Sequence, residues 1–394
     1  MPPSLPGARS AAIATADLRG VNRLLCDAVC GTSDLVEAVH ASVLGWPRRA
    51  LGLAPKTSTG GIPGLAYSGV RGVARLVGRG IDEALRRFPD AAADAPALRH
   101  REALVAALNG VLGDRLAATG NPLAITPRLR LDGHALHLDR DALAVAYPRP
   151  AARLLVMVHG LCMNDLQWDH RGHHHGRALA GELDCSLVHL HYNSGLPIAE
   201  NGLHFSALLQ QLVDAWPHRL QRIAIVGHSM GGLVARAAIA AAQSDGSDWL
   251  GRLDRLATLG TPHLGAPLER AGTVLQGMLS ANAHSAPFKA LGELRSAGIQ
   301  DLRHGLAHRL PPLPGHVRAH AVAATTARRP RPGRAARGLP GDGLVPVASA
   351  FGQHADPRRD LGIANRHRLL VHGTGHVGLL GNAEVHARLR DWLA

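Results

Sequence analysis

The stretch RIAIVGHSMGGLVARAAIAAAQ, residues 222–243, limits the folds open to this chain more than any other. It begins as a short apolar run typical of a buried β-strand and ends as an alanine-rich segment typical of a helix. Between the two lies the pattern Gly-x-Ser-x-Gly, centred on Ser229. A sharp strand-to-helix turn brings neighbouring backbone close, so glycine is needed at 227 and 231, where a Cβ atom would collide. The stretch therefore predicts a strained turn that raises the Ser229 hydroxyl to the rim of a sheet.

From about residue 125 onward, short apolar runs alternate with helical segments. The runs predicted as strands are residues 128–138, 143–148, 153–160, 185–193, 222–229, 255–265, 317–325 and 366–376. The first two are expected to form a strand pair around an Asp132-Gly133 turn. Helices are predicted at residues 203–216, 231–243 and 382–393. Continuous apolar strands that alternate with helices indicate a parallel sheet covered by helices on both faces.

Residues 1–124 have a helical pattern instead, so we expect an N-terminal helical region of unknown role before a second domain at 125–394. Asp34, followed three residues later by Glu37, is typical of a helix start. A second helix is predicted over residues 68–88, with arginines on both sides of an apolar stripe. The stripe consists of Val70, Val73, Val77, Ile81, Leu85 and Phe88. It is either a docking face or the apolar side of a helix that lies on a membrane surface.

The formal net charge of +13 comes almost wholly from arginine. The densest cluster lies in a proline- and glycine-rich loop and consists of Arg328, Arg329, Arg331, Arg334 and Arg337. Such a loop is either solvated or in contact with an anionic membrane surface or substrate. Aromatic residues make up only 3% of the chain, which leaves little to stack on bases, and no nucleic-acid-binding motif is present. We therefore expect no nucleic-acid partner.

Cysteine usage and the distribution of apolar residues bear on the cellular compartment. Cys26, Cys30, Cys162 and Cys185 lack the paired spacing of a zinc site, and four cysteines in so long a chain are typical of reduced thiols. No apolar run approaches the roughly 18 residues that cross a bilayer. The first twenty residues also lack the basic start and apolar core of a signal peptide. We expect a cytoplasmic protein that can be peripheral to a membrane.

Ser229 needs partners before its hydroxyl can act as a nucleophile, because a base must first take its proton. His376 follows the last predicted strand on the loop GTGHVGLL, where such a base is expected. Asp342 lies between two glycines in GLPGDGLVP, beyond the preceding strand, where an acid that orients the base is expected. The chain order Ser229, Asp342, His376 fits a catalytic triad. Asp356 and Asp360 are the alternative acids.

Two backbone amides are also expected to stabilise the oxyanion of a reacting carbonyl. One belongs to Met230, directly after the serine and at the start of the helix. The other is predicted in the loop VHGLCMN, where Gly160 lets the chain approach and Leu161 is the donor. Cys162, beside it, is interpreted as loop packing, since Ser229 already occupies the nucleophile position.

The segments HGLCMND, YNSG, GHSMGG, LGTPHLGAP, GDGLVP and GTGHVGLL together resemble an α/β-hydrolase of the bacterial lipase and esterase type, similar to the branch that includes GPI inositol-deacylase-like proteins. The resemblance covers about residues 126–394. It implies an eight-stranded, mostly parallel sheet, a Ser-His-Asp triad and ester hydrolysis through an acyl-enzyme. The motifs identify the superfamily and leave the substrate open.

We therefore expect a serine carboxylic ester hydrolase that acts on a small-molecule or lipid ester and needs no cofactor. A helical insertion at 266–316, amphipathic through Leu291, Leu294, Ile299 and Leu302, is predicted to cap an apolar acyl pocket. A thioesterase or acyltransferase with the same triad is the nearest alternative. A lipid-surface binding protein without turnover is the alternative from another class.

Two further patterns are interpreted as structural. Residues 373–378 fit G-x-G-x-x-G, but the chain continues for only 16 residues beyond them, which leaves no room for a dinucleotide-binding unit. Metal binding is chemically possible for the histidines at 170, 173, 174, 175, 189 and 191. Because no arrangement of carboxylates accompanies them, we expect no metal site, and metal binding by these segments is the alternative interpretation. His228 is expected to point away from the triad.

Overall fold

The computed structural model describes residues 15–44, 59, 61–86, 99–266, 296–306, 310–327 and 340–394. The chain divides into two compact units, of which the first contains Met1–Pro96 with Ala118–Leu123 and the second Ala97–Ala117 with Ala124–Ala394. The arginine loop at 328–337 and most of the insertion at 266–316 lie outside the described residues. Within the described part of the chain, no helix combines the length and the apolar character needed to span a bilayer.

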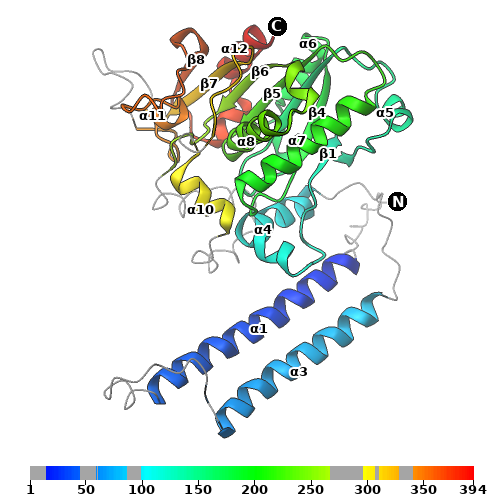
Figure 1. Cartoon of the computed structure of the whole chain (residues 1–394), viewed down its shortest axis with the longest axis vertical. Coiled ribbons are helices and arrows are strands. Elements are labelled where there is room, and N and C mark those ends of the chain that lie inside the picture. Colours follow the sequence, from blue (N-terminus) through cyan, green and yellow to red (C-terminus); the bar gives the residue numbers. More distant parts are fainter. Residues whose placement is uncertain are drawn as a thin grey trace, which may run out of the picture. The chain divides into compact units, whose positions relative to one another are not determined.

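The second unit is built on one eight-stranded sheet in the order β2-β1-β4-β3-β5-β6-β7-β8 (Figure 1). Its strands are β1 Arg128–Leu131, β2 His134–Ala135, β3 Arg153–Val158, β4 Ser186–His191, β5 Arg222–His228, β6 Leu253–Leu259, β7 Arg318–Thr325 and β8 Arg368–His372. β1 is antiparallel to both of its neighbours, and every other pair is parallel. The predicted α/β-hydrolase sheet is confirmed.

Helices cover both faces of this sheet, with α7 Ile198–Ala215 and α8 Met230–Asp245 in one core and α6 His175–Glu182 and α12 Ala383–Leu393 in the other. The remaining helices of this unit are α4 Arg99–Ala118, α5 Arg140–Ala146, α10 Ala297–His304 and α11 Val347–Ala350. Alternate residues of β3 point to opposite sides, so Leu154 and Val156 pack in the core formed with α7 and α8. Leu155 and Met157 pack in the core formed with α6 and α12. Burial on both sides explains why the central strands are continuous apolar runs.

The predicted strand at 143–148 is wrong, because these residues belong largely to helix α5. β1 and β2 do pair around the Asp132-Gly133 turn, in which both residues have a positive φ. The chain then enters α5, whose first turn is capped by the Asp139 side chain accepting a hydrogen bond from the Ala142 amide at 2.8 Å. A short apolar run fits either a strand or a helix, and here the Asp139 cap favours the helix.

The first unit is a hairpin of two long helices, α1 Thr15–Leu44 and α3 Gly61–Arg86. The predicted helix start at Asp34 is wrong, since α1 runs through this position without interruption. Asp34 and Glu37 instead form ion pairs with Arg71 of α3. Helix α4 falls within the region predicted as N-terminal, but its residues up to Ala117 cluster with the second unit.

Polar groups lie between the two helices of the hairpin. Asp82 of α3 accepts from Arg19 at 2.9 Å and from Arg23 at 2.8 Å, both of α1. The side-chain amide of Asn22 donates to the carbonyl of Gly78 at 2.8 Å. The hydrogen bonds from Arg23 and Arg19 outweigh desolvation and lower the pKa of Asp82 to about 2. The hairpin is therefore joined by ion pairs and hydrogen bonds, in contrast to the apolar cores of the second unit.

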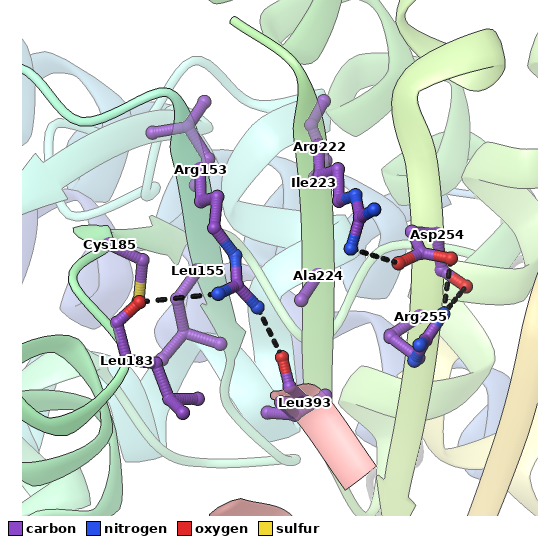
Figure 2. Close-up of a pocket in the computed structure, with 11 residues that line it drawn as sticks. Arg153, Leu155, Leu183, Cys185, Arg222, Ile223, Ala224, Asp254, Arg255 and Leu393 are labelled. Carbon is purple, nitrogen blue, oxygen red and sulfur yellow. Dashed lines mark hydrogen bonds and ion pairs between the residues drawn. The ribbon is translucent and has the colours of Figure 1, made fainter.

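Figure 2 shows the opposite end of the sheet from the predicted site, where β3, β5 and β6 begin. Arg153 donates to the carbonyl oxygens of Leu393 at 2.5 Å and of Leu183 at 3.4 Å. Arg222 and Arg255 both pair with Asp254. The pocket between these residues has a volume of about 20 Å³, which is room for a water molecule only.

Candidate active site

Ser229 occupies the predicted turn between β5 and α8. Its backbone has a φ of 52° and a ψ of −124°, which is a strained conformation for a residue with a side chain. A Cβ atom at Gly231 would lie 2.2 Å from the Val158 carbonyl oxygen, and one at Gly227 would lie 2.5 Å from the Gly232 amide nitrogen. Neighbouring backbone thus lies too close for a side chain at either position, as predicted, so glycine is required at both.

Asp342 and His376 form a buried pair. The Nδ1 atom of His376 lies 2.7 Å from the Oδ2 atom of Asp342, and the two side chains are 3% and 1% exposed. The other carboxylate oxygen of Asp342 accepts from the amides of Leu344 at 2.9 Å and Val345 at 2.8 Å. Although burial raises the pKa of Asp342, the charge and hydrogen bond of His376 and these two amides hold it below the ordinary value. Asp342 is therefore an ionised acceptor for His376.

Backbone at the end of β6 links the serine turn to this pair. The Ser229 amide donates to the Leu259 carbonyl at 2.8 Å. The next residue, Gly260, is so close to the pair that a Cβ atom there would lie 3.1 Å from both Asp342 Oδ2 and His376 Cε1. Ser229, Asp342 and His376 thus meet at the carboxyl ends of β5, β6, β7 and β8, the edge at which α/β sheets bind ligands.

The second ring nitrogen of His376 is free to act as a base. Since Nδ1–H donates to Asp342, the lone pair of the neutral ring lies on Nε2. Among the described residues, Nε2 has no hydrogen-bond partner although it is buried. Catalytic hydrogen bonds often form only in the substrate complex, and the structure leaves this nitrogen available for the hydroxyl proton of Ser229.

The loop predicted to carry the oxyanion donor is a tight turn after β3. The Met163 amide donates to the Gly160 carbonyl at 3.3 Å, and the Cys162 amide donates to the Ser194 hydroxyl at 3.0 Å. These bonds occupy two amides of the turn, whereas the amide of Leu161, the predicted donor, has no hydrogen-bond partner among the described residues. Met230 begins α8, where the first amides of a helix have no intrahelical acceptor.

Residues that sequence reasoning did not single out hold this turn in place. Ser194 lies in the segment after β4 and accepts from Cys162. A Cβ atom at Gly110 of α4 would lie 2.2 Å from the Cys162 sulfur, so the helix backbone rests against the turn. Asn193 donates to the Gly113 carbonyl at 2.9 Å. The motif YNSG contains Asn193 and Ser194, and it is the only signal in the sequence that could have indicated them.

His228 does not point away from the triad as predicted. Its ring centre lies 4.8 Å from that of His376, and its Nε2 donates to the His376 carbonyl at 3.3 Å. Burial, with the neighbouring His376 adding to it, lowers the pKa of His228 to about 3, so this ring is neutral. A neutral ring can make this bond without placing a second positive charge beside the base.

The alternative acids lie elsewhere. Asp356 pairs with Arg358 at 2.9 Å. Asp360 accepts from the amides of His354 and Gly362. Neither carboxylate has a hydrogen bond with His376, whose acidic partner is Asp342.

The described part of the predicted cap is helix α10. Ile299 and Leu302 of this helix are buried, whereas Leu291 and Leu294 lie outside the described residues. The Gly298 amide donates to the carbonyl of Gly195 at 3.1 Å, in the same segment as Ser194. Helix α10 therefore packs beside the residues that support the oxyanion turn.

Comparison with known families gives a match over residues 149–303 to the family described as "Putative serine esterase (DUF676)". The matched part includes the Gly160 turn and Ser229 and ends before Asp342 and His376. A search of curated proteins gave no match. The similarity to GPI inositol-deacylase-like proteins is not confirmed.

Two solved structures, one bacterial and one archaeal, are similar to part of this chain. The mature lipase BlEst2 of Bacillus licheniformis is 18% identical over 62% of this chain and 93% of its own, with a TM-score of 0.43. The Pyrococcus furiosus esterase Pf2001 is 14% identical over 62% of this chain and 84% of its own, with a TM-score of 0.39. The fold itself is established by the strand order and by the Ser229 turn between β5 and α8.

Proposed function

Since the chain is a serine ester hydrolase with the α/β-hydrolase fold, we propose that Ser229, His376 and Asp342 are its catalytic triad and act through an acyl-enzyme. The observation that carries the proposal is the buried Asp342–His376 pair at the edge where the strained turn holds Ser229. His376 can act as the base because the lone pair on its Nε2 atom is free.

Each residue has a defined role in the proposed reaction. His376 Nε2 takes the hydroxyl proton as Ser229 Oγ bonds to the ester carbonyl carbon, and the amides of Leu161 and Met230 stabilise the oxyanion. The C–O bond to the alcohol then breaks as His376 returns the proton to the leaving oxygen. Water repeats the cycle on the acyl-enzyme and releases the acid. Asp342 keeps Nδ1 protonated and stabilises the imidazolium throughout.

Replacement of the nucleophile tests the triad directly. Ser229→Ala should abolish ester hydrolysis and covalent labelling by a fluorophosphonate, because both need the hydroxyl oxygen. Ser244→Ala is the matched control, since Ser244 is exposed near the end of α8. Hydrolysis that persists in a folded Ser229→Ala protein would refute the assignment.

The proposed substrate is a carboxylic ester with an apolar acyl group. Helix α10, the described part of the predicted cap, packs beside the segment that supports the oxyanion turn, and a cap at this place favours an apolar acyl chain. On p-nitrophenyl esters of increasing chain length, kcat/KM should rise from acetate to medium chains. A maximum at acetate with a steady fall would contradict the apolar pocket.

The same triad could act on a thioester or transfer the acyl group to another alcohol. Rates with a matched oxygen ester and thioester, and with added alcohol acceptors, separate these activities from hydrolysis. A lipid-binding protein without turnover would fail to react with the fluorophosphonate.

We also propose that the helical hairpin contacts an anionic membrane surface from the cytoplasmic side. Its apolar side chains point outward: Leu18, Val21, Leu25, Val29, Leu35 and Val36 of α1 and Leu65, Val70, Val73, Leu76, Val77 and Ile81 of α3 are exposed. So many exposed apolar side chains are rare on a surface that faces only water. Val70, Val73, Val77 and Ile81 of the stripe predicted on α3 belong to this face, whereas Leu85 is half-buried and Phe88 lies outside the described residues.

Two features of the hairpin favour lipid as the partner. Its polar groups pair with each other between the helices, as the pairs of Asp82 do, and this suits an apolar surrounding. Arg75 and Arg79 are exposed on α3 beside the apolar side chains, where they can reach lipid phosphates. Four cysteines without disulfide bonds support the reducing compartment.

Vesicle sedimentation tests the membrane contact. The full chain should sediment with phosphatidylglycerol-containing vesicles at low salt, less at high salt, and not with neutral phosphatidylcholine vesicles. Leu25→Glu with Leu76→Glu should abolish sedimentation, whereas Val145→Glu, at an 81% exposed site on α5, should not. A dimer in light scattering that the double substitution splits would show instead that the apolar face binds a second copy.

A further inference from the structure

Three histidines from two distant parts of the second unit converge on one point. His173 precedes α6, His175 is the first residue of α6, and His386 lies on α12. One ring nitrogen from each lies within 4.8 Å of the others. The ring centres are 4.7, 4.9 and 5.6 Å apart. Imidazole nitrogens bonded at about 2.0–2.1 Å to one tetrahedral ion would put the ring centres about 5 Å apart.

The outer hydrogen bonds of two of these rings leave a lone pair on the other nitrogen. His175 Nε2 donates to the Leu379 carbonyl at 2.9 Å, so its Nδ1 carries the lone pair. His386 Nε2 donates to the Glu182 carboxylate at 3.1 Å. The Nδ1 atom of His386 is buried and has no partner among the described residues. Such carboxylate and carbonyl acceptors fix the tautomer and orientation of metal-binding histidines.

One contact within the cluster would change when an ion binds. His173 Nε2 and His175 Nδ1 are 2.9 Å apart, which is a hydrogen bond. An ion bonded to both nitrogens would replace this bond and hold them about 3.3 Å apart, a small movement. A set of imidazoles suits zinc, copper, nickel or iron and does not suit calcium or magnesium, which prefer oxygen.

We propose that His173, His175 and His386 bind one divalent transition metal ion, with Zn²⁺ as the ion most suited to three imidazoles and a water molecule. The ion would join the start of α6 to α12. Leu379, which accepts from His175, follows the proposed base His376 by three residues. The metal would therefore fasten the loop that carries His376 from behind, as a structural site without contact with substrate.

Metal binding can be measured without reference to ester hydrolysis. The full chain, free of any histidine tag, is stripped with a chelator and titrated with Co²⁺, which gives strong visible absorption in tetrahedral sites. We expect a single strong site per chain, displacement by Zn²⁺ and a melting temperature about 5 °C higher with excess Zn²⁺.

Substitutions in the cluster decide whether the ion is at this place. His173→Asn and His386→Asn should each remove the Co²⁺ spectrum and the rise in melting temperature. Glu182→Gln should weaken binding about tenfold while keeping the spectrum. His204→Asn, at an exposed position on α7, is the control and should leave all three readouts unchanged.

The outcomes separate clearly. His173 and His386 are both half-buried, and they lie on separate segments, so either variant tests the ligand set if the other does not fold. A stripped wild-type chain with no Co²⁺ site would overturn the proposal. Equal Co²⁺ binding by the wild-type chain and the His173→Asn chain would overturn it as well, because the ion would then sit on other histidines.

Discussion

Buried neutral histidines should make the second unit sensitive to mild acid. Burial is the main reason that the pKa values of His159, His228 and His320 fall to about 3, with neighbouring histidines adding to it. In the unfolded chain each imidazole returns to a pKa of about 6.5. The unfolded state therefore binds more protons below pH 6.5, so the free energy of unfolding falls as the pH falls.

The magnitude follows from these values. Between about pH 7.5 and pH 5.5 the protonation of one unfolded imidazole changes the free energy of unfolding by about 1.4 kcal/mol, while the folded ring stays neutral. The three histidines together remove about 4 kcal/mol, against a typical total of about 5–15 kcal/mol for a domain. Mild acid should thus cost a large part of the stability.

His320→Leu isolates one of the three contributions. Both ring nitrogens of His320 lack partners among the described residues, so an apolar side chain loses no hydrogen bond there. Urea unfolding, followed by the fluorescence of the buried Trp168 and Trp249, gives the free energy of unfolding at both pH values. The free energy of unfolding at pH 7.5 minus that at pH 5.5 should be about 1.4 kcal/mol smaller in His320→Leu than in the wild-type chain.

The change in the free energy of unfolding between the two pH values separates titration from structural damage, because damage lowers stability equally at both pH values. His204→Leu, at an exposed site, should leave the difference unchanged. If His320→Leu also left it unchanged, the buried ring would be titrating as it does in water, and the reasoning from burial would fail.

Three further predictions concern the active site. Asp342→Asn should lower kcat by on the order of 10³ to 10⁴ through loss of the correct imidazole tautomer, whereas Asp360→Asn should be nearly silent; the reverse result in steady-state kinetics would make Asp360 the acid. Ser194→Ala should lower kcat about tenfold with little change in KM, because the Cys162 amide in the oxyanion turn loses its acceptor. A tenfold rise in KM with kcat unchanged would count against a role of Ser194 in holding this turn. Gly231→Ala should abolish activity and lower the melting temperature, because its Cβ would lie 2.2 Å from the Val158 carbonyl, and an active, stable variant would show that the backbone there can yield.

The features that the sequence predicts well are those set by local backbone geometry. Gly227 and Gly231 are required by contacts within a few residues of the turn or with the adjacent strand, so the motif around Ser229 carries its own evidence. The places of Asp342 and His376 follow from strand order, because the carboxyl ends of parallel strands share one edge of the sheet. The structure brings the two side chains within 2.7 Å, a distance that no pattern in the sequence contains.

The features that the sequence does not predict depend on contacts between distant segments. His386 joins His173 and His175 only because α12 packs against α6. Asp34 and Glu37 resemble a helix start, but their carboxylates instead pair with Arg71 of the neighbouring helix. In both cases the residue type is informative and the partner is supplied by tertiary structure.

Helix α4 has an unusual place in the covalent order of the chain. Residues up to Pro96 and residues 118–123 belong to the hairpin unit, whereas residues 97–117, which include all of α4 except its last residue, belong to the hydrolase unit. The same helix rests with Gly110 against the turn that carries Leu161. The helix that rests against the oxyanion turn is thus encoded between two stretches of the hairpin unit, although it packs with the hydrolase unit.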